Sequence, residues 1–172
     1  MLIERPRRDD FMHKVMTGTI FIEELKEQKS ETCRKILESL PEWFGIPEAT
    51  DAYVKGVVDL PMLVAKDQSG LIVGFIALKP QTSSAIEAYV LGIRPEWHRK
   101  GCGYLLFEAA ENMARELGAK VLTVKTLAET NPNPHYRATR LFYEAMGFDP
   151  IEVFPTLWSP ENPCLLMAKT LK

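Results

Sequence analysis

The segment from His98 to Gly103 combines a histidine, two basic side chains and two glycines, which is the composition of an anion-binding loop. An apolar run from Tyr89 to Ile93 precedes it and an amphipathic run follows it, so the order indicates strand, loop and helix. Gly101 and Gly103 allow unusual φ angles and let a ligand approach the backbone closely. The first turn of a helix also presents N–H groups without intrahelical partners, so we expect a phosphate group at this loop.

The spacing of the glycines disfavours two familiar nucleotide-binding loops. A P-loop ends in Gly-Lys-Ser/Thr, which occurs nowhere in the chain, and no third glycine of a dinucleotide fingerprint follows Gly101 and Gly103. Nucleoside triphosphates and NAD are therefore disfavoured. What remains is a compact cluster of backbone N–H groups beside Arg99 and Lys100, and a pyrophosphate fits that cluster.

The elements around this loop alternate between strand and helix. Short β-branched or aromatic runs predict strands at residues 19–22, 62–65, 71–78, 85–93, 121–127, 151–154 and 164–167. Apolar residues at helical spacing predict helices at residues 30–40, 48–58, 103–117 and 134–146. A strand, a crossover helix and a second strand imply a parallel pair. We therefore expect an α/β fold of mixed α+β type, with helices on both faces of one central mixed sheet.

Two details of this sheet follow from local pattern. In strand 85–93 the two-residue period places Glu87, Tyr89, Leu91 and Ile93 on one face and their neighbours on the other. Glu87 would thus share a face with apolar side chains. Residues 155–163 are polar and proline-rich, so we expect them to form an irregular loop between the last two strands.

Length and charge favour one globular domain. With 172 residues, of which 46% are hydrophobic, the chain fits a single domain spanning residues 1–172, and residues 1–17 read as a flexible lead-in or a short capping element. The formal charge of −2 arises from 21 basic and 23 acidic residues mixed along the sequence. This balance argues against a nucleic-acid partner or an anionic membrane surface, and no window approaches the roughly 20 apolar residues of a membrane span.

Cysteines and histidines are too scattered to indicate a cross-linked or metal-bound fold. No Cys-x-x-Cys pattern occurs, so we expect neither a disulfide framework nor a zinc site, and we expect no metal. A reducing, cytoplasmic location fits best, since no apolar leader follows the charged N-terminus. The residues concerned are Cys33, Cys102, Cys164, His13, His98 and His135.

With these features in place, the sequence resembles the GNAT superfamily of acetyl-CoA-dependent N-acetyltransferases. That family carries Gln/Arg-x-x-Gly-x-Gly/Ala between a strand and a helix, as residues 98–103 do here, with His98 in the first position. Residues 94–97 resemble the family's strand-exit turn, and residues 141–148 resemble its Phe-Tyr-Glu-x-x-Gly-Phe signature. The match covers residues 85–148 well and the closing strands loosely. Where the family often has asparagine at the start of the last helix, this chain has Tyr136, and Asn133 is the better substitute.

The resemblance implies acetyl-CoA as co-substrate and assigns residues to it. Its pyrophosphate would lie on the glycine loop, and the thioester carbonyl would be polarised by a backbone N–H at a bulge near Leu91 to Ile93, eased by Gly92. The expected coenzyme-binding residues are Leu91, Ile93, Arg94, His98, Arg99, Lys100, Gly101, Cys102, Gly103, Tyr104 and Asn133.

Two residues are candidates for the chemistry. An alkyl ammonium has a pKa of about 10.4, so something must take its proton before attack. Glu87 is the candidate base, and an equally open interpretation is a carboxylate that pairs with a lysine. Tyr143 is the candidate acid, although full proton transfer from a phenol (pKa about 10) to a thiolate (about 8.5) is uphill by about 2 kcal/mol. We therefore expect Tyr143 to donate a hydrogen bond to the departing sulfur; the alternative is a core tyrosine.

The sequence thus predicts an N-acetyltransferase that acts on an amine of a small molecule or peptide by direct attack in a ternary complex, as a monomer or homodimer. Cys102 lacks a paired histidine and reads as a small filler residue, not a nucleophile. The acceptor is expected against Trp43, Phe44 and the segment bearing Trp158. Two rivals stay open: a non-catalytic acyl-CoA sensor that acts as an interaction module, and a transferase with a different acyl chain or acceptor.

Overall fold

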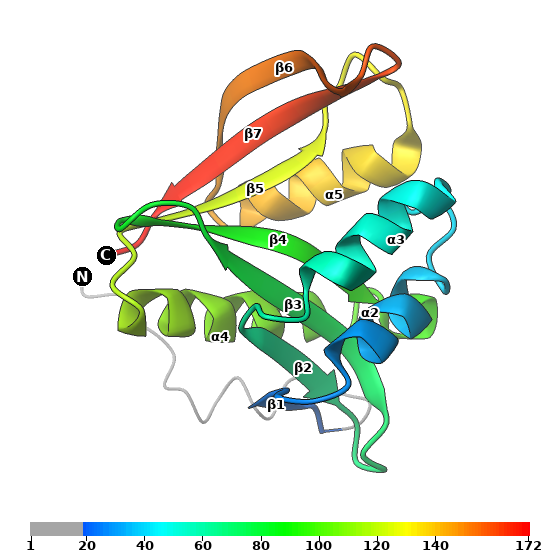
Figure 1. The fold of residues 1–172 in the computed structure, drawn as a ribbon, viewed down its shortest axis with the longest axis vertical. Helices are drawn as coiled ribbons and strands as arrows, with labels where there is room; N and C mark the ends of the chain where they lie inside the picture. Colours follow the sequence, from blue (N-terminus) through cyan, green and yellow to red (C-terminus); the bar gives the residue numbers. More distant parts are fainter. Residues whose placement is uncertain (1–18) are drawn as a thin grey trace, which may run out of the picture.

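A computed structural model describes residues 19–172, and the predicted lead-in at residues 1–17 lies outside this range. The described chain alternates strands and helices around one sheet (Figure 1). None of its helices is long and apolar enough to cross a membrane. In chain order the elements are β1 (Phe21–Glu24), α2 (Lys29–Leu37), α3 (Pro47–Gly56), β2 (Met62–Lys66), β3 (Ile72–Pro80), β4 (Ala85–Ile93), the 3₁₀ turn η1 (Pro95–Trp97), α4 (Cys102–Glu116), β5 (Val121–Leu127), α5 (Pro134–Ala145), β6 (Asp149–Ser159) and β7 (Asn162–Thr170).

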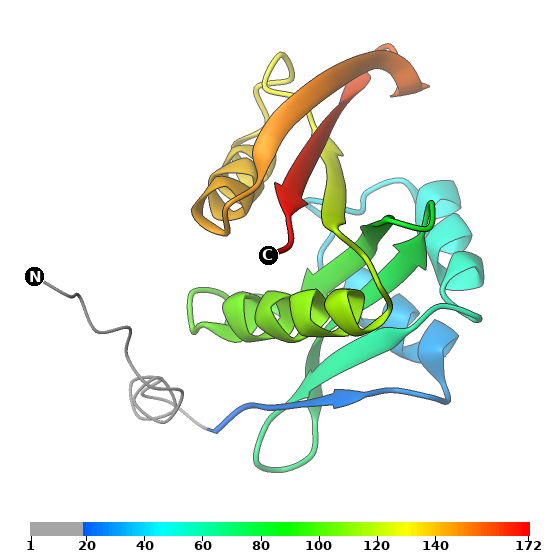
Figure 2. The same ribbon diagram turned by 90° about the vertical axis from the view of Figure 1, so that its left-hand side faces the viewer.

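The sheet has seven strands in the order β1-β2-β3-β4-β5-β7-β6. Every neighbouring pair is antiparallel except β4 and β5, which are parallel, as a βαβ unit requires. Helices α4 and α5 lie on one side of the sheet, and α2 and α3 lie on the other (Figure 2). Each side has its own apolar core, so the predicted mixed sheet with helices on both faces is confirmed.

Strands β4 and β5 pair only where they begin. The register joins Ala85 to Val121, Ile86 to Leu122 and Glu87 to Thr123, after which the two strands diverge (Figure 1). Because β4 stays paired with β3 along its whole length, its other edge beyond Glu87 is left without a partner strand among the described residues. The sheet is therefore open between β4 and β5 beyond this short paired segment.

A bulge in β4 overturns the predicted alternation of its side chains. Ala77 pairs with Val90 and the next residue, Leu78, pairs with Ala88, so Tyr89 is the extra residue. A bulge shifts the phase of all later side chains by one position. Leu91 therefore packs in the α4 core with Ala88, whereas Tyr89 and Val90 face the α2 and α3 core. The bulge lies at Tyr89 and not at residues 91–93, where the resemblance placed it.

The predicted loop at residues 155–163 is also wrong in its extent. Strand β6 continues to Ser159 and β7 begins at Asn162, whose backbone N–H and side-chain amide both donate to Ser159 Oγ at 3.2 Å. The regular register breaks after Phe154 and resumes at Ser159. Pro155 lies between Phe154 and Ser159, where no residue of edge strand β6 has a register partner on β7, so its missing N–H interrupts no regular pair. Proline thus marks an arched edge strand here and not a loop.

Candidate active site

A cavity of about 930 Å³ lies where β4 and β5 diverge. Its walls come from the ends of both strands, the start of α4, one side of α5, the segment between α2 and α3, and Trp158 of β6. Thus the opening in the sheet, the glycine loop and the last helix all border the same space.

The loop before α4 turns through two residues with left-handed backbone. Arg99 has φ of +58° and Gly101, the residue preceding the helix, has φ of +80°. The His98 ring Nε2–H donates to the carbonyl of Ile93 at 2.6 Å, which ties the loop to the end of β4. No side-chain hydrogen bond caps α4, and Gly101 and Cys102 line the cavity. The positive end of the helix dipole therefore faces the cavity, as an anion site requires.

Gly103 contributes differently from what the sequence predicted. Its backbone is not in the left-handed region, so the expectation of an unusual φ holds for Gly101 and is wrong for Gly103. A Cβ at Gly103 would lie 3.1 Å from both Ile93 Cδ1 and Phe142 Cζ. The missing side chain therefore lets α4 pack closely against β4 and α5.

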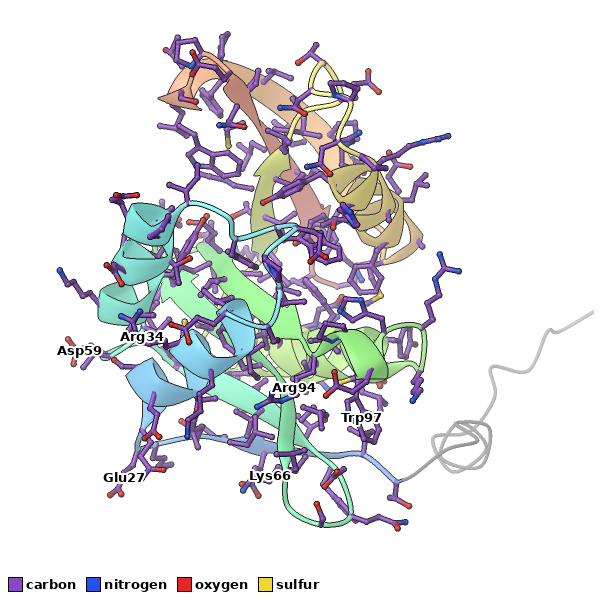
Figure 3. The ribbon with its side chains drawn as sticks, turned by 90° about the vertical axis from the view of Figure 1, so that its right-hand side faces the viewer. Glu27, Arg34, Asp59, Lys66, Arg94 and Trp97 are labelled. Carbon is purple, nitrogen blue, oxygen red and sulfur yellow. The ribbon has the colours of Figure 1, made fainter. Side chains whose placement is uncertain are left out.

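Most of the predicted coenzyme residues border the cavity, and three do not. Arg94 Nε donates to the carbonyl of Ile72 at 3.0 Å, on the side of the molecule seen in Figure 3. The Lys100 ammonium lies 5.2 Å from the centre of the Trp97 ring. Asn133 caps α5, accepting from the backbone N–H groups of the first turn at 2.9 and 3.3 Å. Those that line the cavity are Leu91, Ile93, His98, Arg99, Gly101, Cys102, Gly103 and Tyr104.

Tyr143 of α5 lines the cavity and is 5% exposed. Its ring packs against Phe107, Phe142 and Phe148, with centroids 5.8, 5.9 and 5.8 Å away. Burial raises the pKa of Tyr143 well above its usual value of 10.0, and the nearby phenols of Tyr136 and Tyr53 add to this. The hydroxyl therefore keeps its proton at every physiological pH and can serve as a hydrogen-bond donor.

Glu87 is 4% exposed and does not line the cavity. Lys125 Nζ donates to its Oε1 at 3.1 Å, and Gln81 Nε2 donates to its Oε2 at 2.6 Å. Both carboxylate oxygens thus have a donor, and the lysine pairing that the sequence left open is present. It is Lys125 that borders the cavity in front of Glu87.

Sequence reasoning missed two residues of β5, Lys125 and Thr126. Thr126 lines the cavity, is 2% exposed, and its Oγ1 has no hydrogen-bond partner in the described structure. A buried hydroxyl without a partner is unfavourable, so this atom suits a bound ligand. A signal existed: Leu122, Val124 and Thr126 share one phase of the strand, and a polar residue there breaks the apolar pattern.

The segment between α2 and α3 is fastened to α5 across the cavity. Tyr136 OH donates to the Trp43 carbonyl at 2.6 Å, and Trp43 Nε1 donates to Thr139 Oγ1 at 3.0 Å. The Trp43 ring also meets His98 and His135 edge-on, with centroids 5.6 and 4.9 Å away. Tyr136, which stands where the resemblance led us to look for asparagine, therefore holds the cavity's cover, and burial raises its pKa to about 12.

Comparison with known proteins decides the family. Residues 59–150 match the profile described as an acetyltransferase (GNAT) domain. The chain belongs to this family. Its GNAT region contains the glycine loop, both diverging strands and all of α5. Within residues 19–172 of this GNAT chain, no group of three or more His, Cys, Asp or Glu residues could hold a metal ion.

One curated relative is the mycothiol acetyltransferase of Propionibacterium freudenreichii subsp. shermanii. It is 32% identical over 90 residues, which are 51% of this chain and 27% of the relative, so the GNAT chain spans about a quarter of that protein. Solved structures share the fold. A GNAT-family acetyltransferase from Desulfovibrio desulfuricans has a TM-score of 0.76 at 19% identity, with 90% of this chain and all of the other covered. An aminoglycoside 6'-N-acetyltransferase complexed with coenzyme A has a TM-score of 0.69 at 20% identity, covering 88% and 97%.

Proposed function

We propose that the protein transfers the acetyl group of acetyl-CoA to an amine by direct attack within a ternary complex. The observation that carries this proposal is one cavity bordered by the uncapped start of α4, the unpaired edge of β4 and the buried phenol of Tyr143. The fold shared with an acetyltransferase complexed with coenzyme A supports it. Cys102, the cysteine that lines the cavity, does not act as nucleophile in this scheme, because burial raises its pKa to about 12 and leaves it a thiol.

The residues present fit an acyl-CoA. Backbone N–H groups at residues 101–103, together with the Arg99 side chain, offer a cradle for the pyrophosphate. Along the opening in the sheet, the free edge of β4 offers backbone donors and acceptors to the amide-bearing arm. Thr126 Oγ1 supplies a further hydrogen bond there, which removes its own burial cost. Coenzyme A brings the activated thioester, and the protein's part is to hold and polarise it.

Tyr143 donates a hydrogen bond to the sulfur as the carbon–sulfur bond breaks. Because the phenol's pKa is raised by burial, it stays protonated while negative charge grows on the thiolate. The acceptor's ammonium must first lose a proton, and Glu87 is the candidate to receive it. For that, Lys125 has to move away from Oε1, because Lys125 borders the cavity and Glu87 does not.

The test is thiol release from acetyl-CoA over a panel of primary amines, with wild-type protein and Tyr143→Phe. Hydrogen bonds to charged groups contribute about 1.5–3 kcal/mol, so the variant should lose roughly 10- to 150-fold in kcat with little change in KM for acetyl-CoA. Its unfolding midpoint in urea should match the wild type, because the ring contacts remain. Unchanged kcat would remove Tyr143 from the mechanism. Binding of acetyl-CoA without release for any amine would identify a non-catalytic acyl-CoA-binding module instead.

A further inference from the structure

Aromatic side chains from three elements and one connecting segment line the cavity. Phe44 precedes α3, Tyr53 lies on α3, Tyr89 forms the bulge of β4, and Trp158 comes from the arched part of β6. The ring centroids of Phe44 and Tyr53 are 6.0 Å apart, and those of Tyr53 and Tyr89 are 5.3 Å apart. Gly56 makes room for Tyr89, since a Cβ there would lie 2.6 Å from its hydroxyl. Phe44, Tyr53 and Tyr89 thus form a continuous aromatic surface, and Trp158 borders the same cavity. We call these four side chains the aromatic wall.

The charges around the cavity are of one sign. None of its lining residues, all of which belong to the described part of the chain, is an aspartate or a glutamate. The lysine and arginine side chains among its lining residues are Arg99 at the glycine loop and Lys125 on β5. The buried carboxylate of Glu87, which does not line the cavity, already has Lys125 and Gln81 as donors. A second ammonium on a substrate would therefore find no free carboxylate among the lining residues, which makes its burial costly. Ring faces are its remaining attraction, and the Tyr89 ring already has the Lys79 ammonium 5.0 Å from its centre.

We propose that the acceptor is a monoamine with an aromatic or apolar body and no second positive charge. This inference rests on the proposed function and names its substrate class. The body packs against the aromatic wall, and the amine points toward the thioester. Aromatic side chains bury large areas and reward a flat or branched apolar body. Polyamines, aminoglycosides and lysine side chains flanked by other cations are disfavoured, because the lining residues offer their extra ammonium groups no carboxylate.

The experiment compares amines that differ only at the far end. Hexylamine and 1,6-diaminohexane are one matched pair, and norleucine amide and lysine amide are another. Thiol release from acetyl-CoA gives kcat/KM for each, and the rise in unfolding temperature that each amine causes in the presence of coenzyme A gives a readout of binding alone. We expect the apolar member of each pair to be preferred by at least about tenfold in kcat/KM and to cause the larger rise.

Trp158 provides a matched pair of variants. It is 41% exposed at the arched edge of β6, so the fold tolerates its replacement. Trp158→Glu adds a carboxylate to the wall and should reduce the preference for the apolar amines at least about fivefold, because the second ammonium gains a partner. Trp158→Gln removes the same ring without adding charge and should leave the preference within about twofold of wild type.

The outcomes separate the two proposals. Turnover with a preference for the dicationic amines, in either pair, overturns the acceptor class and leaves the acetyltransferase function standing. Equal effects of Trp158→Glu and Trp158→Gln likewise overturn the charge argument. Absence of thiol release with every amine overturns the proposed function, and the acceptor class falls with it.

Discussion

Replacing Thr126 by valine should stabilise the unliganded protein and lower its affinity for coenzyme A. Valine keeps the branched shape of threonine and exchanges only Oγ1 for a methyl group. In the described structure that oxygen has no hydrogen-bond partner, and the residue is 2% exposed. An unsatisfied buried polar group costs about 1–3 kcal/mol, so Thr126→Val should raise the free energy of unfolding of the unliganded protein by about 1–2 kcal/mol. For a domain of this size, that corresponds to a rise of about 2–8 °C in Tm.

Ligand affinity should move the other way. If Thr126 Oγ1 hydrogen-bonds to the acyl-CoA arm, its loss costs the complex about 0.5–1.5 kcal/mol, or roughly a two- to tenfold weaker Kd. Urea unfolding without ligand measures the first effect, and calorimetric titration with coenzyme A measures the second. Thr123→Val is the matched control, because Thr123 lies on the same strand and does not line the cavity. It should not weaken the affinity.

The reasoning fails if Thr126→Val is destabilised while its affinity for coenzyme A is unchanged. That pair of results would mean that the hydroxyl serves the fold and not the ligand. A stabilised variant with unchanged affinity would support the cost assigned to the unpaired hydroxyl and would remove Thr126 from the binding site.

Three further predictions concern the ion pair, the buried thiols and the glycine loop. Lys125→Met should lower the free energy of unfolding in urea by about 3–5 kcal/mol, because it leaves the buried Glu87 carboxylate without its cation, whereas Glu87→Gln should lower it by about 1–2 kcal/mol, because Lys125 is partly exposed. The double variant should recover most of the stability lost in Lys125→Met, and equal costs of the two single changes would contradict this asymmetry. Burial raises the pKa values of Cys33 and Cys102 from 9.0 to about 12, so the unfolded chain loses these protons first as pH rises. The contribution of the two thiols to stability is therefore complete below pH 9 and is lost toward pH 12. Urea unfolding should give a lower free energy of unfolding at about pH 10.5 than at about pH 8, and Cys102→Ala should make this decrease smaller. Gly101→Ala forces alanine into a φ of +80° at a cost of about 1–2 kcal/mol and should lower coenzyme A affinity in titrations, with Gly118→Ala, also left-handed and far from the cavity, as the control for strain alone.

Local patterns located most of the elements. The bounds of β4 and β5 are those that the β-branched and aromatic runs predicted, and α4 begins one residue before its expected start. These segments are bounded by proline, glycine and polar turn residues, so the local sequence is enough to predict where they begin and end. The first strand lies slightly later than residues 19–22, because its pairing with β2 starts at Phe21. That register depends on a partner strand far along the chain.

What local pattern missed depends on contacts between distant residues. The bulge at Tyr89 is set by how β3 and β4 align, so nothing within residues 85–93 announces it. Pro155 looked like a loop residue because its position on the sheet's edge is a property of the whole topology. For the site, composition found the glycine loop, and the family signature found Tyr143. The donors that surround Glu87 come from Gln81 and Lys125, and only the folded register brings them together.

The short pairing of β4 with β5 divides the sheet into two halves. On one side, β2, β3 and β4 are joined as successive hairpins, and on the other, β6 and β7 form a hairpin that docks on β5. Ala85 and Val121 are 36 residues apart with α4 between them, and β5 pairs with β7 over separations of 37 to 49 residues, so both contacts cost more chain entropy to close than the hairpins do. Three residue pairs join the two halves edge to edge, so this junction has few strand contacts to lose when the sheet opens locally. A substrate that contacts both β4 and β5 would stabilise this junction, so we expect the liganded protein to open between these strands less often than the unliganded protein.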